Sequence, residues 1–243
     1  MSTVRIEVLY PQMNDLYGDG GNLQYLKRKL DAMGVSTEII RTGMEDVPAF
    51  AREKVDLLYI GPCTESNQEY QAQALQKYAG ALAERMDGSQ VTLMTGNAFE
   101  LLGDSVINED GRSFPCLGLI PSYARRFTRL RYNDLSLGTW ENLEIVGFKN
   151  QLSHSYAIDG EKIKSFLFME KGSGWNPESK WEGFHKNWFF ATYLLGPILP
   201  LNPLFCEHLI RLAGGDATAA HRDAAMSAYN QRLKEFRDPS VKF

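Results

Sequence analysis

Hydrophobic and polar positions show two periodicities in the first half of the chain, one typical of strands and one typical of helices. Continuous or alternating apolar runs predict four strands, at Val4–Tyr10, Val35–Ile40, Val55–Ile60 and Val91–Met94. Apolar residues three or four positions apart predict helices, at Leu23–Met33, at Glu65–Met86 and beginning again at Ala98–Leu102. Strands and helices that alternate through short connections indicate an α/β fold with a doubly wound, mostly parallel sheet.

After Gly103 the pattern changes, because strand-like runs follow one another without helices between them. They lie at Leu117–Ile120, Phe127–Tyr132, Leu143–Phe148 and Ile163–Met169. We therefore expect an antiparallel extension of the parallel sheet. A polar loop at Gly172–Gly183 leads to a strand at Asn187–Leu195 and to helices at Pro203–Gly214 and Ala217–Phe236. We expect residues 1–243 to form a single domain.

Composition narrows the classes of function. The net charge of -4 argues against a nucleic-acid partner, which needs a basic surface. Three cysteines without a paired spacing, and histidines without ligand spacing, predict no metal site, and no motif indicates a cofactor. No apolar run reaches the length of a membrane span and no signal segment opens the chain, so we expect a cytoplasmic protein without a membrane span.

The segment from Val91 to Gly103 carries the strongest indication of function. It predicts a short strand, a tight turn at Thr95-Gly96-Asn97 and a helical start, which is the shape that hydrolytic α/β enzymes use to present a nucleophile. Gly96 at the apex has no reactive atom. The Thr95 hydroxyl is an alternative nucleophile, although no histidine is placed to activate it, and a role in stabilising the turn is the other interpretation. The site is laid out like an active site that lacks its reactive group.

A second candidate follows the buried strand at Val55–Ile60, at the edge where open α/β sheets bind ligands. The sequence there is Gly61-Pro62-Cys63-Thr64. Cys63 is either a reactive thiol or a packed one, and no neighbouring cation in the sequence would lower its pKa. Gly18-Asp19-Gly20-Gly21 fits neither phosphate-binding pattern and is interpreted as a turn that caps the following helix.

Basic residues gather in one short segment. They are Arg125, Arg126, Arg129 and Arg131. They are either solvated strand residues or contacts for an anionic ligand or a partner. The histidines, such as His154 and His185, stand alone and indicate no catalytic pairing.

Five blocks in the same order resemble a known family over about the whole chain. The blocks are Leu16–Leu23, Phe99–Gly103, Asp110-Gly111 followed by Leu117–Ile120, Ile145–Asn150 and Thr192–Pro200. The chain resembles class I glutamine amidotransferases of the cobyric acid synthase (CobB/CobQ) type, and most of all the glutaminase subunit (GatD) of lipid II isoglutaminyl synthase. The resemblance implies a flavodoxin-like fold and a Mur-ligase-like partner subunit.

This chain differs from the family at the positions that correspond to the family's catalytic residues. The resemblance implies that the catalytic cysteine corresponds to Gly96, or to Thr95 if the turn has gained a residue, and that the general-base histidine corresponds to Leu195. The loop that supplies oxyanion donors corresponds to Gly61-Pro62-Cys63, and proline has no N–H to donate. We therefore expect the glutaminase activity to be lost.

Three interpretations remain open. The first is a non-catalytic partner or regulatory subunit of a Mur-ligase-like amidating enzyme in cell-wall precursor metabolism. The second is a hydrolase or transferase with a relocated nucleophile, Cys63 or Thr95. The third is a module that binds a small amino-acid-like or cell-wall precursor ligand in the vestigial pocket. In each case the binding positions are predicted at Gly61, Cys63, Asn97 and Arg129.

Overall fold

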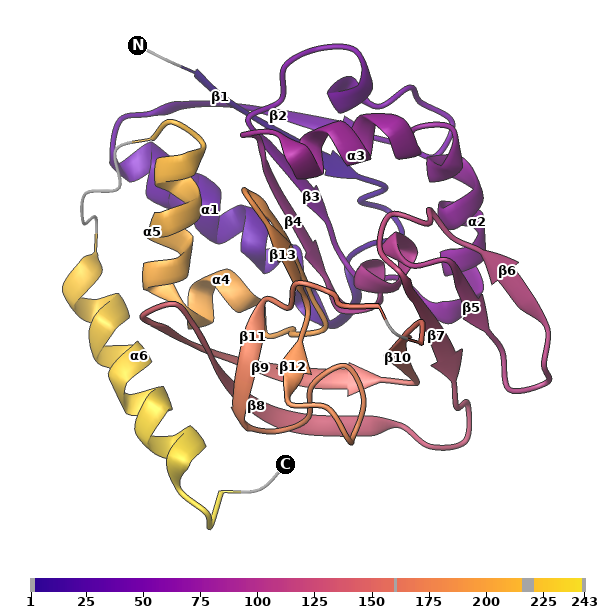
Figure 1. Ribbon diagram of the computed structural model, residues 1–243. Coiled ribbons are helices and arrows are strands. Elements are labelled where there is room, and N and C mark those ends of the chain that lie inside the picture. Colours follow the sequence, from indigo (N-terminus) through magenta and orange to yellow (C-terminus); the bar gives the residue numbers. More distant parts are fainter. Residues whose placement is uncertain (1–2, 160, 216–220, 242–243) are drawn as a thin grey trace.

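The computed structural model describes residues 3–159, 161–215 and 221–241. A six-stranded sheet lies at the centre, in the order β13-β14-β4-β3-β1-β2 (Figure 1). Its strands are β1 (Thr3–Leu9), β2 (Ser36–Thr42), β3 (Leu57–Ile60), β4 (Val91–Thr95), β13 (Phe184–Lys186) and β14 (Phe189–Thr192). Neighbouring strands pair in parallel, except that β13 runs antiparallel to β14 at the edge. The predicted fold class is confirmed, with an α/β architecture around a mostly parallel sheet.

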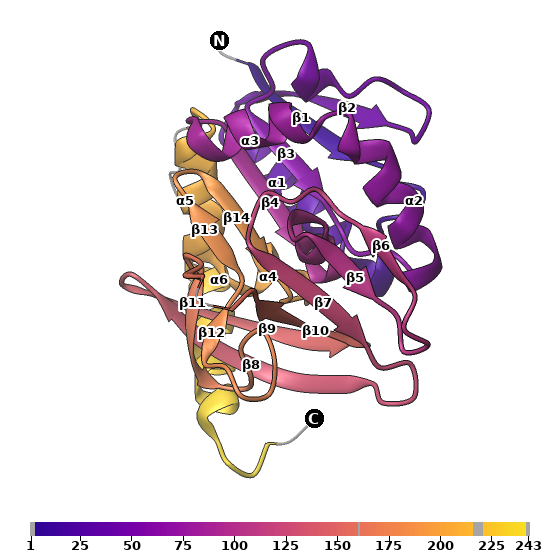
Figure 2. The ribbon, with the colours of Figure 1, turned by 45° about the vertical axis from the view of Figure 1, so that its right-hand side comes forward.

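Helices cover both faces of this sheet (Figures 1 and 2). One face is covered by α1 (Gly21–Ala32) and α5 (Pro203–Leu212), and the other by α2 (Glu65–Gln76) and α3 (Ala79–Asp87). All four residues of β3 are buried, as expected for a strand with a helical layer on each side. Two separate apolar clusters form, one on each face, because the sheet itself lies between them.

The extension consists of two further four-stranded sheets, whose neighbouring strands are antiparallel except for the parallel pair β5 and β7. One has the order β10-β7-β5-β6, with β5 (Ser105–Ile107), β6 (Ser113–Pro115), β7 (Ser122–Arg126) and β10 (Ser153–Ala157). The other has the order β12-β11-β8-β9, with β8 (Tyr132–Trp140), β9 (Leu143–Gln151), β11 (Leu167–Lys171) and β12 (Trp181–Glu182). The short helix α4 (Ile198–Leu201) follows β14, and α6 (Arg222–Arg237) packs on β8 and β9 through Tyr229 and Leu233.

Two predicted elements are wrong for a shared physical reason. The helix predicted to begin at Ala98 is a 3₁₀ helix, Gly96–Leu102, and the strand predicted at Leu117–Ile120 is irregular. The carbonyls of Leu101 and Leu102, which a longer helix would use, accept hydrogen bonds from the N–H groups of residues 117, 119 and 120. Hydrogen bonds from residues 117–120 therefore end the 3₁₀ helix at Leu102.

Other boundaries also differ from the prediction. The single helix predicted at Glu65–Met86 is two helices, because the chain tightens at Tyr78, whose N–H donates to the Leu75 carbonyl at 2.8 Å. Residues 127–131 of the predicted strand Phe127–Tyr132 form the loop between β7 and β8. The first residues of the helix predicted at Ala217–Phe236 lie outside the described residues. Within the described residues, no helix combines the length and the apolar character that a membrane crossing requires.

Candidate functional site

A tight turn follows β4 at its carboxyl end, and we call this turn the elbow. The chain leaves β4 through Gly96, whose φ of +59° lies in the left-handed region that favours glycine. The 3₁₀ helix Gly96–Leu102 begins there, and most of its side chains are buried. The sequence predicted the strand and the turn at this position, whereas the helix predicted after them is a 3₁₀ helix.

The space above the elbow is filled by two apolar side chains. A Cβ atom placed on Gly96 would lie 2.7 Å from the Cβ of Pro62 and 3.1 Å from Cδ2 of Leu195. Real Cβ atoms do not approach carbon atoms at 2.7 Å, so a side chain at this position would displace Pro62. The structure thus brings together Gly96, Leu195 and the Gly61–Cys63 loop, as the resemblance implied, and packs them against one another.

Leu195 is held firmly in this position. It lies just after β14 and pairs with Phe148 of β9, with its N–H donating to the Phe148 carbonyl at 2.8 Å and its carbonyl accepting at 3.0 Å. The side chain is buried. An aliphatic side chain has no titratable atom, so this position cannot take or give a proton.

A small hollow remains beside the elbow. It is lined by Pro62, Cys63, Gly96, Asn97, Tyr193 and Leu195 on one side and by Tyr17, Glu65 and residues 150–153 on the other. Its volume of about 10 Å³ holds roughly one water molecule. No histidine is among these lining residues, which all belong to the described part of the chain. A glutamine side chain does not fit in this space.

Polar side chains close the mouth of the hollow. The Arg131 guanidinium donates to the Tyr17 hydroxyl at 2.9 Å and to Oδ1 of Asn150 at 2.5 Å. Tyr17 itself has a φ of +62°, which is uncommon for a residue with a side chain. These contacts join the first loop of the chain to the β7–β8 loop and to β9 across the vestigial site.

The loop to which the resemblance assigns the oxyanion donors is hydrogen-bonded within the protein. The Cys63 N–H donates to Oδ1 of Asn97 at 3.0 Å, and Nδ2 of Asn97 donates back to the Cys63 carbonyl at 2.8 Å. Pro62 has no N–H. Because an oxyanion hole needs donors that aim at the developing charge, neither Pro62 nor Cys63 is available to supply one.

The two alternative nucleophiles lie in unfavourable surroundings. Burial, reinforced by the negative charges of Glu100 and Glu65, raises the pKa of the Cys63 thiol to about 12, so the thiolate is disfavoured. Thr95 is fully buried, and its hydroxyl donates to Oδ2 of Asp19 at 2.5 Å. Thr95 is not among the residues that line the hollow.

A buried polar network lies behind the elbow. Asp19 accepts hydrogen bonds from the Thr95 hydroxyl, the Tyr59 hydroxyl and Nδ2 of Asn22, the last at 3.0 Å. Oδ1 of Asn22 in turn accepts from the Leu199 N–H at 2.8 Å. The sequence alone predicts Asp19 only as part of a capping turn. The pairing of Asp19 with Asn22 three residues later, both buried, is the signal that could have revealed this network.

Burial raises the pKa of the Asp19 carboxyl to about 6, although its hydrogen bonds oppose the rise. The folded state therefore holds this proton more tightly than the unfolded chain. The resulting stabilisation is fully present below about pH 4 and is lost as the pH rises through about 6, an expected loss of about 3 kcal/mol.

This pH dependence is checked by urea unfolding at about pH 4 and about pH 7.5. Burial also raises the pKa of Glu100 and of Glu182, so Asp19→Asn still loses stability between the two pH values, but we expect the loss to be about 3 kcal/mol smaller than in the wild type. Asp15→Asn, at an exposed neighbouring carboxyl, keeps the full loss. An unchanged pH dependence in Asp19→Asn would contradict the assignment.

A second buried carboxylate supports the 3₁₀ helix. Glu100 accepts from Nε2 of Gln68 at 2.8 Å, from the Tyr193 hydroxyl at 2.9 Å and from the Ser153 hydroxyl. Burial raises its pKa. Arg126 donates to Oε1 of Gln68 at 2.5 Å and is itself buried, so this arginine stabilises the scaffold.

The predicted arginine group is divided in the structure. Arg126 is buried behind the elbow, Arg131 closes the hollow, and Arg125 lies over the Tyr123 ring at 5.8 Å. Arg129 is exposed and lines a separate hollow at the β5–β6 turn, so the structure does not bring it to the elbow. Among the described residues, no group of three acidic, cysteine or histidine side chains is arranged to hold a metal ion.

Comparison with known proteins finds similar curated sequences. No family model matches the sequence. The chain is 26% identical over 208 residues to the lipid II isoglutaminyl synthase (glutamine-hydrolyzing) subunit GatD of Staphylococcus aureus strain N315, covering 84% of this chain and 83% of the relative. It is 25% identical over 212 residues to the same subunit of Streptococcus pneumoniae strain ATCC BAA-255 / R6, covering 86% and 80%.

A solved structure is similar as well. The crystal structure of a glutamine amidotransferase from Thermotoga maritima matches with a TM-score of 0.52 at 10% identity, over 98% of this chain and 88% of the other. This likeness supports the fold. The similarity to the two GatD subunits confirms the resemblance seen in the sequence.

Proposed function

We propose that this glutamine amidotransferase-like chain is a non-catalytic subunit of a Mur-ligase-like amidating enzyme, active in cytoplasmic cell-wall precursor metabolism. In this proposal residues 1–243 act as a single domain. The observation that carries it is the elbow itself, where Pro62 and Leu195 pack on Gly96 in place of a reactive pair.

Similarity to subunits of a larger enzyme supports a role for this chain in binding a partner protein. The names of both relatives describe a subunit of a synthase, and this chain covers at least 80% of each. A glutaminase of this kind delivers ammonia to an amide-forming partner, so the face around the elbow must meet that partner. The buried networks at Asp19 and Glu100 still hold this face in shape, although the groups that would produce ammonia are missing.

The other interpretations receive less support from the geometry. A ligand-binding module needs space, and the hollow at the elbow holds roughly one water molecule. Relocated chemistry needs an ionisable and accessible nucleophile, whereas Cys63 is buried with a raised pKa and Thr95 donates its hydroxyl hydrogen to Asp19.

The test is assembly with each Mur-ligase-like protein that the same genome encodes. We expect co-expression to give a stable complex that elutes as one species in size-exclusion chromatography with light scattering. A Mur ligase that acts without a glutaminase subunit is the matched control and should elute separately. Separate elution of the chain and its intended partner at concentrations of tens of micromolar would contradict the proposal.

A further inference from the structure

The loop between β7 and β8 exposes an apolar tip. Leu130 is 73% exposed, the highest value among the large apolar side chains of the described residues. Phe127, at the start of the same loop, is 36% exposed. A single exposed leucine is ordinary on a protein surface, so its meaning depends on what holds and surrounds it.

The loop is held in place at both ends. The Phe127 N–H donates to the Leu152 carbonyl at 2.6 Å, and the Phe127 ring lies 5.6 Å from the ring of His154. At the other end Arg131 bonds Tyr17 and Asn150 at the mouth of the hollow. A tip fixed in this way loses little entropy when it binds, which favours a role in recognition.

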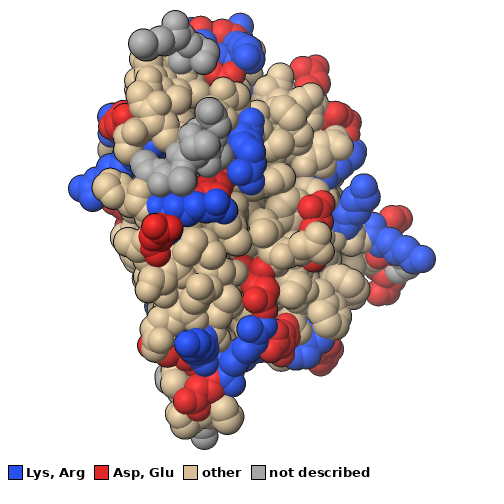
Figure 3. All heavy atoms as spheres, turned by 90° about the vertical axis from the view of Figure 1, so that its left-hand side faces the viewer, with Lys and Arg blue, Asp and Glu red and all other residues tan. Residues whose placement is uncertain are grey.

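Positive charge surrounds the tip, in contrast to the chain as a whole, which carries a net charge of -4. Arg125, Arg129 and Arg131 are exposed on or beside the loop, and Arg112 lies on the adjacent β5–β6 turn. Two carboxylates lie at the same turn, where Asp110 pairs with Arg112 at 2.7 Å and Glu109 accepts from Thr128, so the four arginines leave an excess of positive charge. On the side that carries α5 and α6, by contrast, acidic and basic side chains are interspersed (Figure 3).

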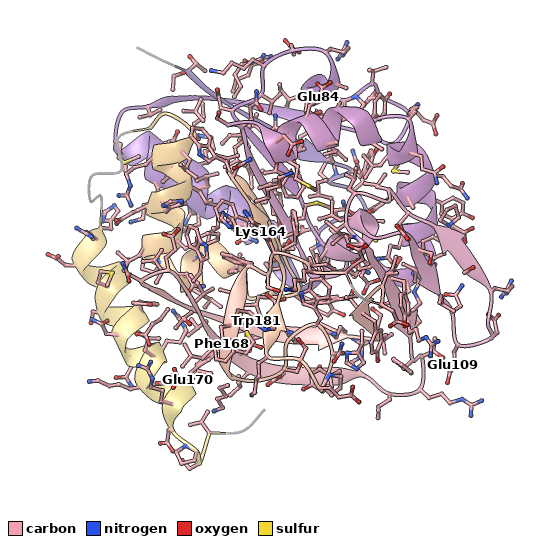
Figure 4. The ribbon with its side chains drawn as sticks, viewed as in Figure 1. Glu84, Glu109, Lys164, Phe168, Glu170 and Trp181 are labelled. Carbon is pink, nitrogen blue, oxygen red and sulfur yellow. The ribbon has the colours of Figure 1, made fainter. Side chains whose placement is uncertain are left out.

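A hollow of about 620 Å³ adjoins the loop. It is lined by Asn108, Glu109, Asp110, Arg112, Thr128 and Arg129. Glu109 marks this edge of the molecule in Figure 4. A protruding apolar side chain beside a polar hollow gives this surface the relief that shape-complementary interfaces between folded proteins have.

Resting on the function proposed above, we propose that the Phe127–Arg131 loop and the adjoining hollow dock an acidic surface of the amide-forming partner, with Leu130 entering an apolar socket of that partner. Arginine pairs well with carboxylates at interfaces, and a central apolar anchor carries much of the binding energy. A flat anionic membrane fits less well, because a flat surface would not fill the hollow beside the tip.

The test measures affinity of the full chain for the Mur-ligase-like protein by calorimetry. Leu130→Asp and Arg129→Glu are each expected to weaken binding by tenfold or more. Trp181→Ala and Arg28→Glu are the matched controls. Trp181 is 56% exposed and packs against Phe168 on the β11–β12 side, 5.0 Å between ring centroids (Figure 4), and Arg28 is exposed on α1. Circular dichroism checks that every variant folds.

The outcomes separate this inference from the function on which it rests. Binding by the wild type with unchanged affinity in Leu130→Asp and Arg129→Glu overturns the docking site and leaves the proposed function standing. Loss of binding in Trp181→Ala alone also overturns the docking site and leaves the proposed function standing. The contact with the partner would then lie on β11 and β12. No binding by the wild type overturns the proposed function. Leu130-dependent sedimentation with phosphatidylglycerol vesicles, without binding to the partner, overturns docking on a protein in favour of a membrane.

Discussion

Incubation of this protein with glutamine is expected to release no glutamate above the uncatalysed background, with or without an amide-forming partner. The position that resembles the nucleophile is Gly96 and the position that resembles the base is Leu195, and the two are packed together with Pro62. Loss of a nucleophile from such a unit costs on the order of 10⁶ in turnover, and loss of the base as well leaves only weak catalysis by binding and dipoles. The Cys63 N–H donates to Asn97 and Pro62 has no N–H, so these two positions add no oxyanion donor.

The measurement is a coupled glutamate assay at micromolar protein, with a glutamine-hydrolysing GatD subunit as the positive control. The Gly96→Cys/Leu195→His variant is expected to remain inactive, and any gain should require Pro62→Gly in addition. Robust turnover by the wild type would contradict the prediction. Cys63→Ala and Thr95→Ala would then show which side chain performs the chemistry.

The sequence predicted the part of the site that depends on local pattern. A buried strand, a glycine at the apex and a helical start are sufficient to place the elbow, and the family resemblance then locates Leu195. It did not predict the contacts between segments that are distant in the sequence. Pro62 and Gly96 are 34 positions apart, and nothing local indicates that one side chain covers the other.

The same distinction explains the errors in the fold. The end of the 3₁₀ helix is fixed by N–H donors of residues 117–120, and the split of the arginine group depends on which side chains fold back on Gln68 or Tyr17. Apolar periodicity reports which residues are buried within one element. It contains no information about which element supplies the missing hydrogen-bond partner.

The second large effect concerns the fit of Pro62 over the elbow. Gly96→Ala is expected to lower the free energy of unfolding by about 2 to 4 kcal/mol, because it adds a positive-φ cost of about 1 kcal/mol and an overlap cost of about 1 to 3 kcal/mol. Gly34→Ala is the matched control. Gly34 has a φ of +70°, and no atom lies within 4 Å of the position that the alanine methyl group would take, so this substitution incurs the backbone cost alone.

A double-mutant cycle with Pro62→Gly isolates the overlap. In the Pro62→Gly background the added methyl meets Leu195 only, so Gly96→Ala should cost about 1 to 2 kcal/mol, and the coupling free energy should be about 1 to 2 kcal/mol. Urea unfolding of the four proteins gives this quantity directly. Equal effects of Gly96→Ala and Gly34→Ala, with no coupling to Pro62, would mean that backbone conformation alone requires the glycine. A side chain at the elbow would then be tolerated, and closure by Pro62 could no longer explain why this position carries none.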